Sequence, residues 1–559
     1  MDDTYVYSPL DCEKQEIRLF RANRLLDRTN SFGFSLLQIT LNEAGNLGYI
    51  ALSYVWGDPH RTSPVILENG RVLLVTENLR SFIDQFFSHS VPDVCYLWID
   101  SICINQDDAI EKSWQVQQMR CIYELASKVL AWLGPTTNDS DVAMDCFERI
   151  AQEVEDGTSE LLASFREFYG FTPESPGAKV ILNPWASPTN AIDGPLLKRI
   201  AELVSEACQR DDFPLDALTS LFRRPWWERA WVLQEAQAND VVVVSCGAKR
   251  TKLSHIQLVF QGLESCSYRL EAMSLEGGGR RLTQQQQRIL RWGRNELSSI
   301  ATPLLEGGVL GCTLEEVLER MHGPGGEASR RVKASDPRDL VFAMLGLPVL
   351  RDTVRAIVPD YTKTCRDVFI ETARALIVHG ATNMLWYCST PDSADGIDGL
   401  PSWVPDWSST SISPVAWILK MGDYWPTLPK GNSPSPEPQF WTGNVNKFSI
   451  EMVGYELGRV QNIYRASAYI TPDNKMRAAW HTAILGSRPF VTANGYLGIG
   501  TSALRQNDMV VLIPGIRAPW ILRGVAGGKA RLVGPAYVHG IMRGEWMTTS
   551  PRLKQFTVC

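Results

Sequence analysis

The sequence is short of the residues and patterns that mark several large classes of protein. It has only seven histidines, and its twelve cysteines stand at irregular spacings without a Cys-x-x-Cys pair, so we expect no metal site. No Gly-x-x-x-x-Gly-Lys motif occurs, which argues against the phosphate-binding loop of nucleotide triphosphatases. No internal repeat occurs either, which argues against a solenoid or a propeller. We therefore expect a protein without a resident cofactor.

Long runs of one chemical kind are also missing. The formal net charge is −7 and there is no long basic run, so we expect no nucleic-acid partner. No apolar run approaches about 20 residues, and the acidic start at Asp2 and Asp3 is not followed by an apolar segment. We therefore expect neither a membrane span nor a signal peptide. Many cysteines lie in apolar runs, which is typical of reduced, buried thiols in a cytosolic or nuclear protein.

What is present describes a globular protein of several domains. The chain has 559 residues, and at about 150 residues per domain this length favours three or four units. Hydrophobic residues at 44% and charged residues at 21% are ordinary for a folded protein. Changes of pattern along the chain predict four parts: an α/β domain at 1–250 with an insertion at about 136–195, a mainly helical region at 251–390, an irregular connection rich in proline and serine at 391–440, and a β-rich unit at 441–559.

Strand and helix signals alternate within the first 250 residues. Three nearly continuous apolar runs read as buried strands, at 49–56, 95–100 and 129–133. With a helical pattern at 109–127, they predict a mostly parallel sheet that is flanked by helices and has these three strands side by side. Asp58 and Asp100 stand at the ends of two of the strands, where open parallel sheets bind ligands, although an aspartate at a loop start is equally suited to capping.

The last hundred residues change to short strands separated by glycine-rich turns such as Gly527-Gly528. Even spacing of such strands predicts a small antiparallel barrel or sandwich. We expect residues 490–547 to fold around a core of their own rather than to complete the first sheet.

Residues 224–236 hold three tryptophans and four charges. Because a proline suits the first helical turn and no breaker comes after it, we predict one helix that continues to Gln237. Helical spacing would place Glu228, Trp231 and Glu235 on one face, with an aromatic ring one turn from a carboxylate. The alternative is that the tryptophans are core residues and the charges form a solvated or salt-bridged rim.

Three blocks of residues, in this order, resemble the fungal heterokaryon incompatibility (HET) domain family. They are Tyr49 to Asp58, Leu97 to Gly134, and Trp226 to Ala236. The ordered match covers about residues 49–236, and the segments at 336–347 and 359–361 are similar to segments on the carboxy-terminal side of this domain in fungal proteins. The resemblance implies a fungal, cytoplasmic protein with a part in non-self recognition and programmed cell death.

HET domains in turn look distantly like TIR domains. The stretch Trp231-Val232-Leu233-Gln234-Glu235 is similar to the Trp-Cys-x-x-Glu helix of TIR domains that hydrolyse NAD, with valine in place of the cysteine. The resemblance implies a TIR-like fold, NAD or a related nucleotide as the substrate, and Glu235 as the catalytic residue. A fixed carboxylate beside the ribose would stabilise the cation that forms when the nicotinamide bond breaks. The candidate substrate-binding residues are Trp56, Asp58, Asp100 and Trp231.

Three functions stay open at this point. The α/β domain could hydrolyse NAD when it assembles, or it could be a non-catalytic module that signals by oligomerising, as many TIR domains do. A third alternative is an enzyme of secondary metabolism that uses the same fold for another small molecule. The first two readings expect self-association through the HET domain, with a sensor in residues 250–480 or in a separate protein.

Overall fold

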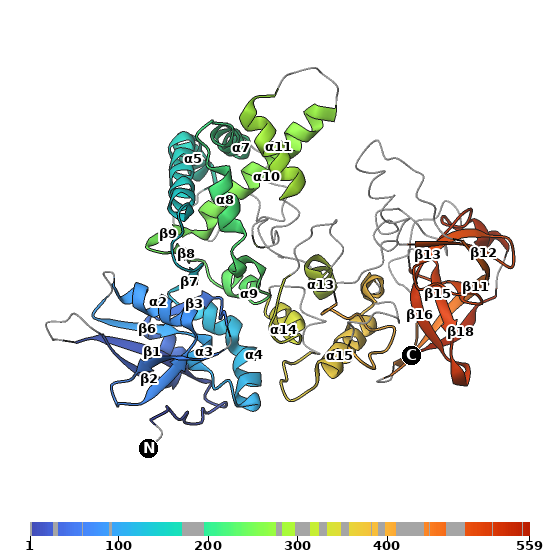
Figure 1. Ribbon diagram of the computed structural model, residues 1–559, viewed down its shortest axis with the longest axis horizontal. Coiled ribbons are helices and arrows are strands. Elements are labelled where there is room, and N and C mark those ends of the chain that lie inside the picture. The colour runs from blue at the N-terminus through green and yellow to red at the C-terminus, as the bar shows by residue number, and fades with distance from the viewer. Residues whose placement is uncertain are drawn as a thin grey trace.

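A computed structural model shows an α/β unit, a helical part and a β-barrel that succeed one another along the chain (Figure 1). It describes the whole sequence apart from residues 1–2, 26–31, 59, 89–91, 170–194, 276–281, 297–303, 305–312, 323–331, 348–356, 382, 389–396, 410–440, 446–447, 465–486, 517 and 550–551. Within the described residues, no helix is long and apolar enough to cross a membrane.

In the described part of the chain, the α/β unit is built on a seven-stranded sheet in the order β2-β1-β6-β3-β7-β8-β9. The strands are β1 Glu16–Arg24, β2 Phe32–Thr40, β3 Ile50–Tyr54, β6 Val94–Trp98, β7 Lys128–Trp132, β8 Val242–Cys246 and β9 Lys249–Lys252. The central strands β6, β3, β7 and β8 run parallel, and antiparallel strands flank them on both sides. The predicted mostly parallel sheet is confirmed, with β3 between β6 and β7.

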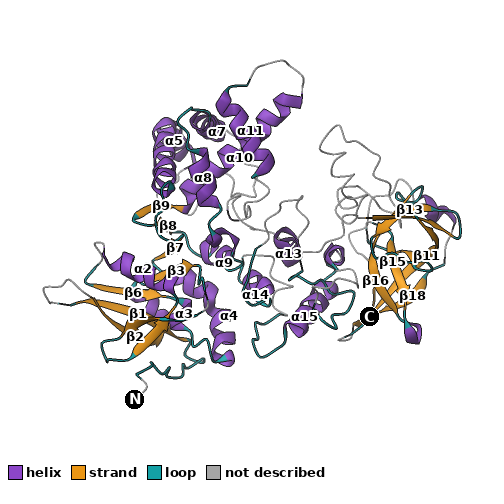
Figure 2. Cartoon of the chain, viewed as in Figure 1, coloured by secondary structure: helices purple, strands orange, loops and turns teal. Residues whose placement is uncertain are grey.

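Helices and a hairpin surround this sheet (Figure 2). The hairpin pairs β4 Ser63–Ile66 with β5 Val72–Val75. The helices are α1 Leu41–Leu47, α2 Glu77–Ser88, α3 Asp100–Cys103 and α4 Ala109–Leu125, with the 3₁₀ turn η2 Pro225–Glu228 and α9 Val232–Gln237 later in the chain. Trp98, Trp132 and Trp227 are at most 2% exposed and so belong to the core.

Five further helices pack on one another beyond β8 and β9 (Figure 1). They are α5 Ser140–Tyr169, α7 Pro195–Cys208, α8 Leu215–Phe222, α10 Leu253–Leu275 and α11 Gln284–Asn295. The predicted insertion at 136–195 therefore begins with a long helix that takes part in a core through Phe147 and Ile150. The proline-rich remainder of the insertion, at 170–194, lies outside the described residues.

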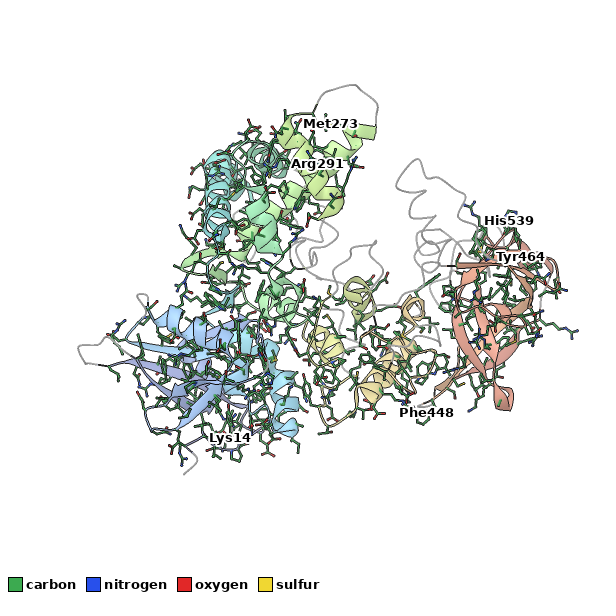
Figure 3. The ribbon with its side chains drawn as sticks, in the orientation of Figure 1. Lys14, Met273, Arg291, Phe448, Tyr464 and His539 are labelled. Atoms are coloured by element: carbon green, nitrogen blue, oxygen red, sulfur yellow. The ribbon has the colours of Figure 1, made fainter. Side chains whose placement is uncertain are left out.

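A second group of helices lies between the α/β unit and the barrel (Figure 1). It comprises α13 Leu314–His322, α14 Asp339–Leu345, α15 Cys365–Val378 and the 3₁₀ turn η5 Asn383–Tyr387. The guanidinium of Arg366, on α15, stands 5.5 Å from the ring centre of Phe448, which lies on the side of the barrel that is next to the helical part (Figure 3). This contact helps to join the helical part to the barrel.

Among the described residues, the carboxy-terminal strands form a second sheet that shares no pairing with the first. Its strands are β10 Trp441–Val445, β11 Ile450–Ile463, β12 Ser487–Thr492, β13 Leu497–Thr501, β14 Met509–Leu512, β15 Trp520–Gly524, β16 Ala530–Pro535, β17 Tyr537–Val538 and β18 Lys554–Val558, with 3₁₀ turns η6 Ala526–Gly528 and η7 Glu545–Thr549. Pairing of β14 with β11 closes the sheet into a barrel. The interior is a hydrophobic cluster of its own, whereas Trp520 packs on Trp386 of the helical part.

Candidate functional site

The tryptophan-rich stretch does not form the single helix that its sequence predicts. The first turn, η2, ends at Glu228, and Arg229 is extended, with φ −71° and ψ 135°. The backbone turns away because it pairs with a distant segment: the Ala230 N–H donates to the Lys333 carbonyl over 2.9 Å, and the Lys333 N–H donates to the Glu228 carbonyl over 2.5 Å. These bonds replace the helical ones, and α9 starts only at Val232.

The break separates the two glutamates that a continuous helix would have placed on one face. Glu228 is 5% exposed and pairs with the Lys333 ammonium over 2.7 Å. Glu235 lies on α9 and contacts Ser53 of β3. The predicted common face of Glu228, Trp231 and Glu235 is therefore wrong.

The side chain of Glu235 is 1% exposed, and its carboxylate is hydrogen-bonded to other side chains of the protein. Its carboxylate accepts a hydrogen bond from the Ser53 hydroxyl and another from Arg229 Nη1 over 3.2 Å. Ser53 belongs to β3, and its oxygen also accepts from the Trp226 indole over 2.8 Å. Burial raises the pKa of Glu235, and Arg229 and Ser53 only partly oppose this effect.

Asp100 approaches the same arginine from the neighbouring strand. It is the first residue of α3, two residues after the end of β6, and its carboxylate accepts from the Trp56 indole over 2.9 Å and from the Ser101 N–H over 2.7 Å. Burial raises the pKa of Asp100, with the charge of Arg229 as the largest opposing effect. Burial disfavours the charged form of Arg229, but the facing carboxyls of Glu235 and Asp100 outweigh it and raise the pKa of the guanidinium. Arg229 is thus ion-paired with Glu235 and lies close enough to Asp100 for their charges to interact.

Aromatic side chains surround this acid–arginine cluster, by which we mean Asp100, Arg229 and Glu235. The Tyr54 and Ser101 hydroxyls are hydrogen-bonded over 2.6 Å. Trp56 is half-buried, and the Arg61 guanidinium lies 6.0 Å from its ring centre. Arg229 is 16% exposed, so the cluster reaches the surface at its arginine rather than at Glu235.

Asp58 does not join the cluster. Its side chain is 74% exposed and pairs with His60 over 2.5 Å in the loop after β3. Hydrogen bonds from His60 hold the pKa of Asp58 below its ordinary value. The position fits the loop-capping alternative.

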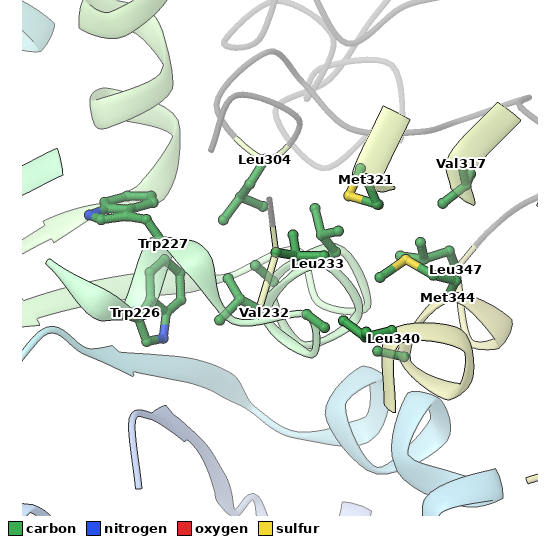
Figure 4. Packing of buried hydrophobic residues seen from close by; sticks show 14 of the residues in the cluster. Trp226, Trp227, Val232, Leu233, Leu304, Val317, Met321, Leu340, Met344 and Leu347 are labelled. Atoms are coloured by element: carbon green, nitrogen blue, oxygen red, sulfur yellow. The ribbon is translucent and has the colours of Figure 1, made fainter. Parts of the chain in front are cut away.

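Trp231 lies on the other side of α9, against the helical part. Its indole hydrogen-bonds the carboxyl of Asp339, which also accepts a hydrogen bond from the Tyr361 hydroxyl. Figure 4 shows Val232 and Leu233 of α9 beside Leu340 and other apolar side chains of the helical part. Trp231 therefore belongs to the contact between α9 and α14.

The structure brings Trp56, Asp100 and Glu235 together and places Asp58 and Trp231 elsewhere. The roles of all five as substrate-contacting residues stay predictions. Sequence reasoning did not assign Arg229 to the site, although Arg229 ion-pairs with Glu235 and its charge also interacts with that of Asp100. It also missed Ser53, although a small hydroxyl inside an otherwise apolar and aromatic run at 49–56 is a usable signal for a buried polar contact.

The chemistry that this arrangement offers is proton transfer and anion binding. Two buried carboxyls with raised pKa values keep a proton to a higher pH than ordinary carboxyls do. The nearby guanidinium of Arg229 can bind a phosphate once a carboxylate yields it. Trp56 offers a ring for stacking. Among the described residues, no group of three or more histidine, cysteine, aspartate or glutamate side chains is placed to hold a metal ion.

Comparison with known proteins gives matches to both ends of the chain. Residues 49–235 match the family model described as Heterokaryon incompatibility protein (HET), and residues 465–558 match the Het-6 beta-barrel domain. The chain is also 25% identical to Heterokaryon incompatibility protein 6, OR allele, of Neurospora crassa, over 90% of each chain. No solved structure matches. The first match contains β3, β6 and α9 as far as Glu235, and so the whole acid–arginine cluster.

Proposed function

We propose that this chain is a member of the heterokaryon incompatibility (HET) family and acts in non-self recognition between fungal cells and in the programmed cell death that results. In this proposal the α/β domain is a signalling module that works by self-association. The similarity to Heterokaryon incompatibility protein 6, over 90% of each chain, supports the first half of this proposal. The surroundings of Glu235 support the second half.

The surroundings of Glu235 bear on whether this residue has a catalytic or a structural role. A carboxylate that stabilises a ribosyl cation has to touch the sugar. In this chain the carboxylate is 1% exposed and is held by Ser53 of β3 and by Arg229. Breaking a buried ion pair costs about 3–5 kcal/mol, so a substrate that displaced Arg229 from Glu235 would have to offset this free energy. This supports a structural role, in which Glu235 ties α9 to the sheet and keeps Arg229 in place.

NAD hydrolysis is the second candidate, and the composition of the cluster favours it. Burial raises the pKa values of both Asp100 and Glu235, and perturbed carboxyls beside a cation are frequent in catalytic sites. Trp56 is half-buried next to Asp100, where a ring could stack. In this candidate the segment around Arg229 leaves Lys333 when the protein assembles, so that Glu235 becomes accessible to the ribose.

A substitution of Glu235 separates the two candidates. Wild type, Glu235→Gln and Glu228→Gln would be expressed in a fungal host, with cell death and cellular NAD measured together. Glu228→Gln is the matched control, because Glu228 is also a buried glutamate in an ion pair of the same segment but faces Lys333 instead of the cluster. The thermal stability of the three purified proteins reports any loss that is due to unfolding.

Signalling by self-association predicts cell death without prior NAD loss in wild type, and death in both variants in proportion to their folded protein. Hydrolysis predicts NAD loss before death, with turnover lowered on the order of a hundredfold in Glu235→Gln and unchanged in Glu228→Gln. NAD loss before death, lowered only in Glu235→Gln, would favour NAD hydrolysis over signalling by self-association.

A further inference from the structure

A groove lies between two helices of the group beyond β8 and β9. One face of α8 and the facing side of α11 line this groove, and its volume is about 430 Å³. Figure 3 labels Arg291, which α11 contributes to the lining. The described lining contains none of Asp100, Arg229 and Glu235, so the groove is separate from the acid–arginine cluster.

Two ion pairs join the helices across the groove. Toward the amino-terminal ends of the helices Arg288 pairs with Asp216 over 3.0 Å, and at their carboxy-terminal ends Arg223 pairs with Glu296 over 2.5 Å. About two turns of each helix lie between the two pairs. The helices are therefore held side by side in the same direction, with a stretch of groove between the ion pairs.

Arg291 belongs to this stretch, and its side chain is exposed. Its Nε donates to the Gln287 carbonyl over 3.3 Å, within the same helix. In the part of the chain that the structure describes, no carboxylate pairs with the Arg291 guanidinium. Because Arg223 and Arg288 each have one acid, the third arginine leaves the lining with an excess of positive charge.

The hydroxyl groups on the α8 side of the groove already donate hydrogen bonds within their own helix. Thr219 donates to the Leu215 carbonyl over 2.7 Å, and Ser220 donates to the Asp216 carbonyl over 3.0 Å. The terminal nitrogens of Arg291 remain as charged donors for a ligand. A ligand that uses them has to accept hydrogen bonds and carry negative charge.

A phosphate suits these donors better than a carboxylate does. The lining already provides the carboxylates of Asp216 and Glu296, and a further single charge would have little advantage over them. A phosphate group carries about 1.5–2 negative charges at pH 7, and a guanidinium can bind it through two parallel hydrogen bonds. The Asp216 side chain is 91% exposed, and exposed ion pairs contribute little free energy, so a phosphate can take its place at Arg288.

We propose that the groove between α8 and α11 binds a small diphosphate. Arg288 and Arg291 are three residues apart on α11, and this spacing places side chains on one face of a helix with Cβ atoms about 5–6 Å apart. Two phosphate groups that share a bridging oxygen can thus meet one guanidinium each. Arg223 adds positive charge from α8 and keeps Glu296 as its partner.

Calorimetric titration of the full chain at low salt tests this site. Inorganic pyrophosphate is the probe for a free diphosphate, and ADP is the probe for a diphosphate that carries an organic group; binding of either one supports the site. Sulfate, a dianion with a single tetrahedral group, should bind at least tenfold more weakly. The affinity for pyrophosphate should fall as salt is added, because the groove is open to solvent.

Arg291→Ala should weaken pyrophosphate binding at least tenfold, because it removes the guanidinium whose donors are unused. Arg291→Lys keeps the charge but not the paired donors, and its affinity should lie between those of wild type and Arg291→Ala. Arg294→Ala is the matched control. Arg294 lies on the same helix, but it pairs with Glu271 over 2.7 Å and lies outside the described lining, so this variant should bind as wild type does.

Asp216→Asn should change binding in the opposite direction. It releases Arg288 from its acid, so pyrophosphate should bind several-fold more tightly than to wild type. Because Asp216 and Arg291 are both exposed, we expect their variants to keep the circular dichroism spectrum and the melting temperature of wild type.

Two results would overturn the diphosphate site. Equal weakening in Arg291→Ala and Arg294→Ala would show a general attraction of anions to a basic helix. Pyrophosphate and ADP that do not bind at millimolar concentration, or that bind no more tightly than sulfate, would show that the groove does not recognise a diphosphate.

Discussion

The backbone N–H of Ala230 donates to the carbonyl oxygen of Lys333 over 2.9 Å, and this bond ties the site segment of the α/β domain to the helical part beyond it. The same lysine holds Glu228 through its ammonium group. Because Arg229 lies between these two contacts, the position of the guanidinium relative to Asp100 and Glu235 depends on a residue outside the HET match.

Lys333→Met should destabilise the protein by about 1–3 kcal/mol, since it removes the ammonium group that pairs with the buried carboxylate of Glu228. Chemical denaturation would measure the loss. Glu228→Gln combined with Lys333→Met should recover part of the stability, because the buried negative charge is then gone. If the losses of the two single variants add up to the loss of the double variant, the ion pair contributes nothing.

Ser53→Ala should cost about 1–3 kcal/mol, although it removes only one oxygen atom. The change leaves the Trp226 indole without an acceptor and Glu235 without one of its donors, both in a buried setting. Ser101→Ala, which removes a half-buried hydroxyl paired with Tyr54, is the comparison and should cost less. Thermal unfolding of both variants, measured side by side, checks the order.

The stability of the cluster should depend on pH with a definite sign. Burial raises the pKa values of Asp100 and Glu235 in the folded protein, so the folded state holds these protons more tightly. The stability they contribute is complete below the pKa of an unfolded carboxyl, about 4, and is lost as the pH rises through the folded-state values.

The free energy of unfolding of wild type, minus that of Glu235→Gln, should therefore fall as the pH rises above about 4. The same should hold for Asp100→Asn. Denaturation curves at a series of pH values measure both differences. A difference that grows with pH would mean that the arginine, rather than burial, sets the pKa values.

Trp227→Ala should cost about 3–5 kcal/mol, because the ring is 2% exposed and packs edge-on against Trp226 and Phe222. Trp227→Phe keeps part of this packing and should lose less. We expect a smaller yield of folded protein, with the activity per folded molecule unchanged. Loss of activity at an unchanged melting temperature would instead give Trp227 a functional role.

The sequence by itself determined the elements whose cause is local. The apolar runs at 49–56, 95–100 and 129–133 became adjacent strands of a mostly parallel sheet, because a strand covered on both faces needs apolar residues throughout. The short, evenly spaced strands with glycine-rich turns form the closed barrel that their pattern predicts. Trp56 and Asp100 follow two strands that were predicted to be adjacent, and the structure joins them by a hydrogen bond.

Only the tertiary structure decided what surrounds Glu235. The stretch from Trp226 to Gln237 has no helix breaker, yet the helix is interrupted because backbone groups of Lys333, distant in sequence, bond to Glu228 and Ala230. Spacing along one segment also cannot show that Trp231 hydrogen-bonds Asp339 or that the charge of Arg229 interacts with two acids. Burial and charge contacts of this kind depend on which distant segments meet, and local pattern carries no information about that.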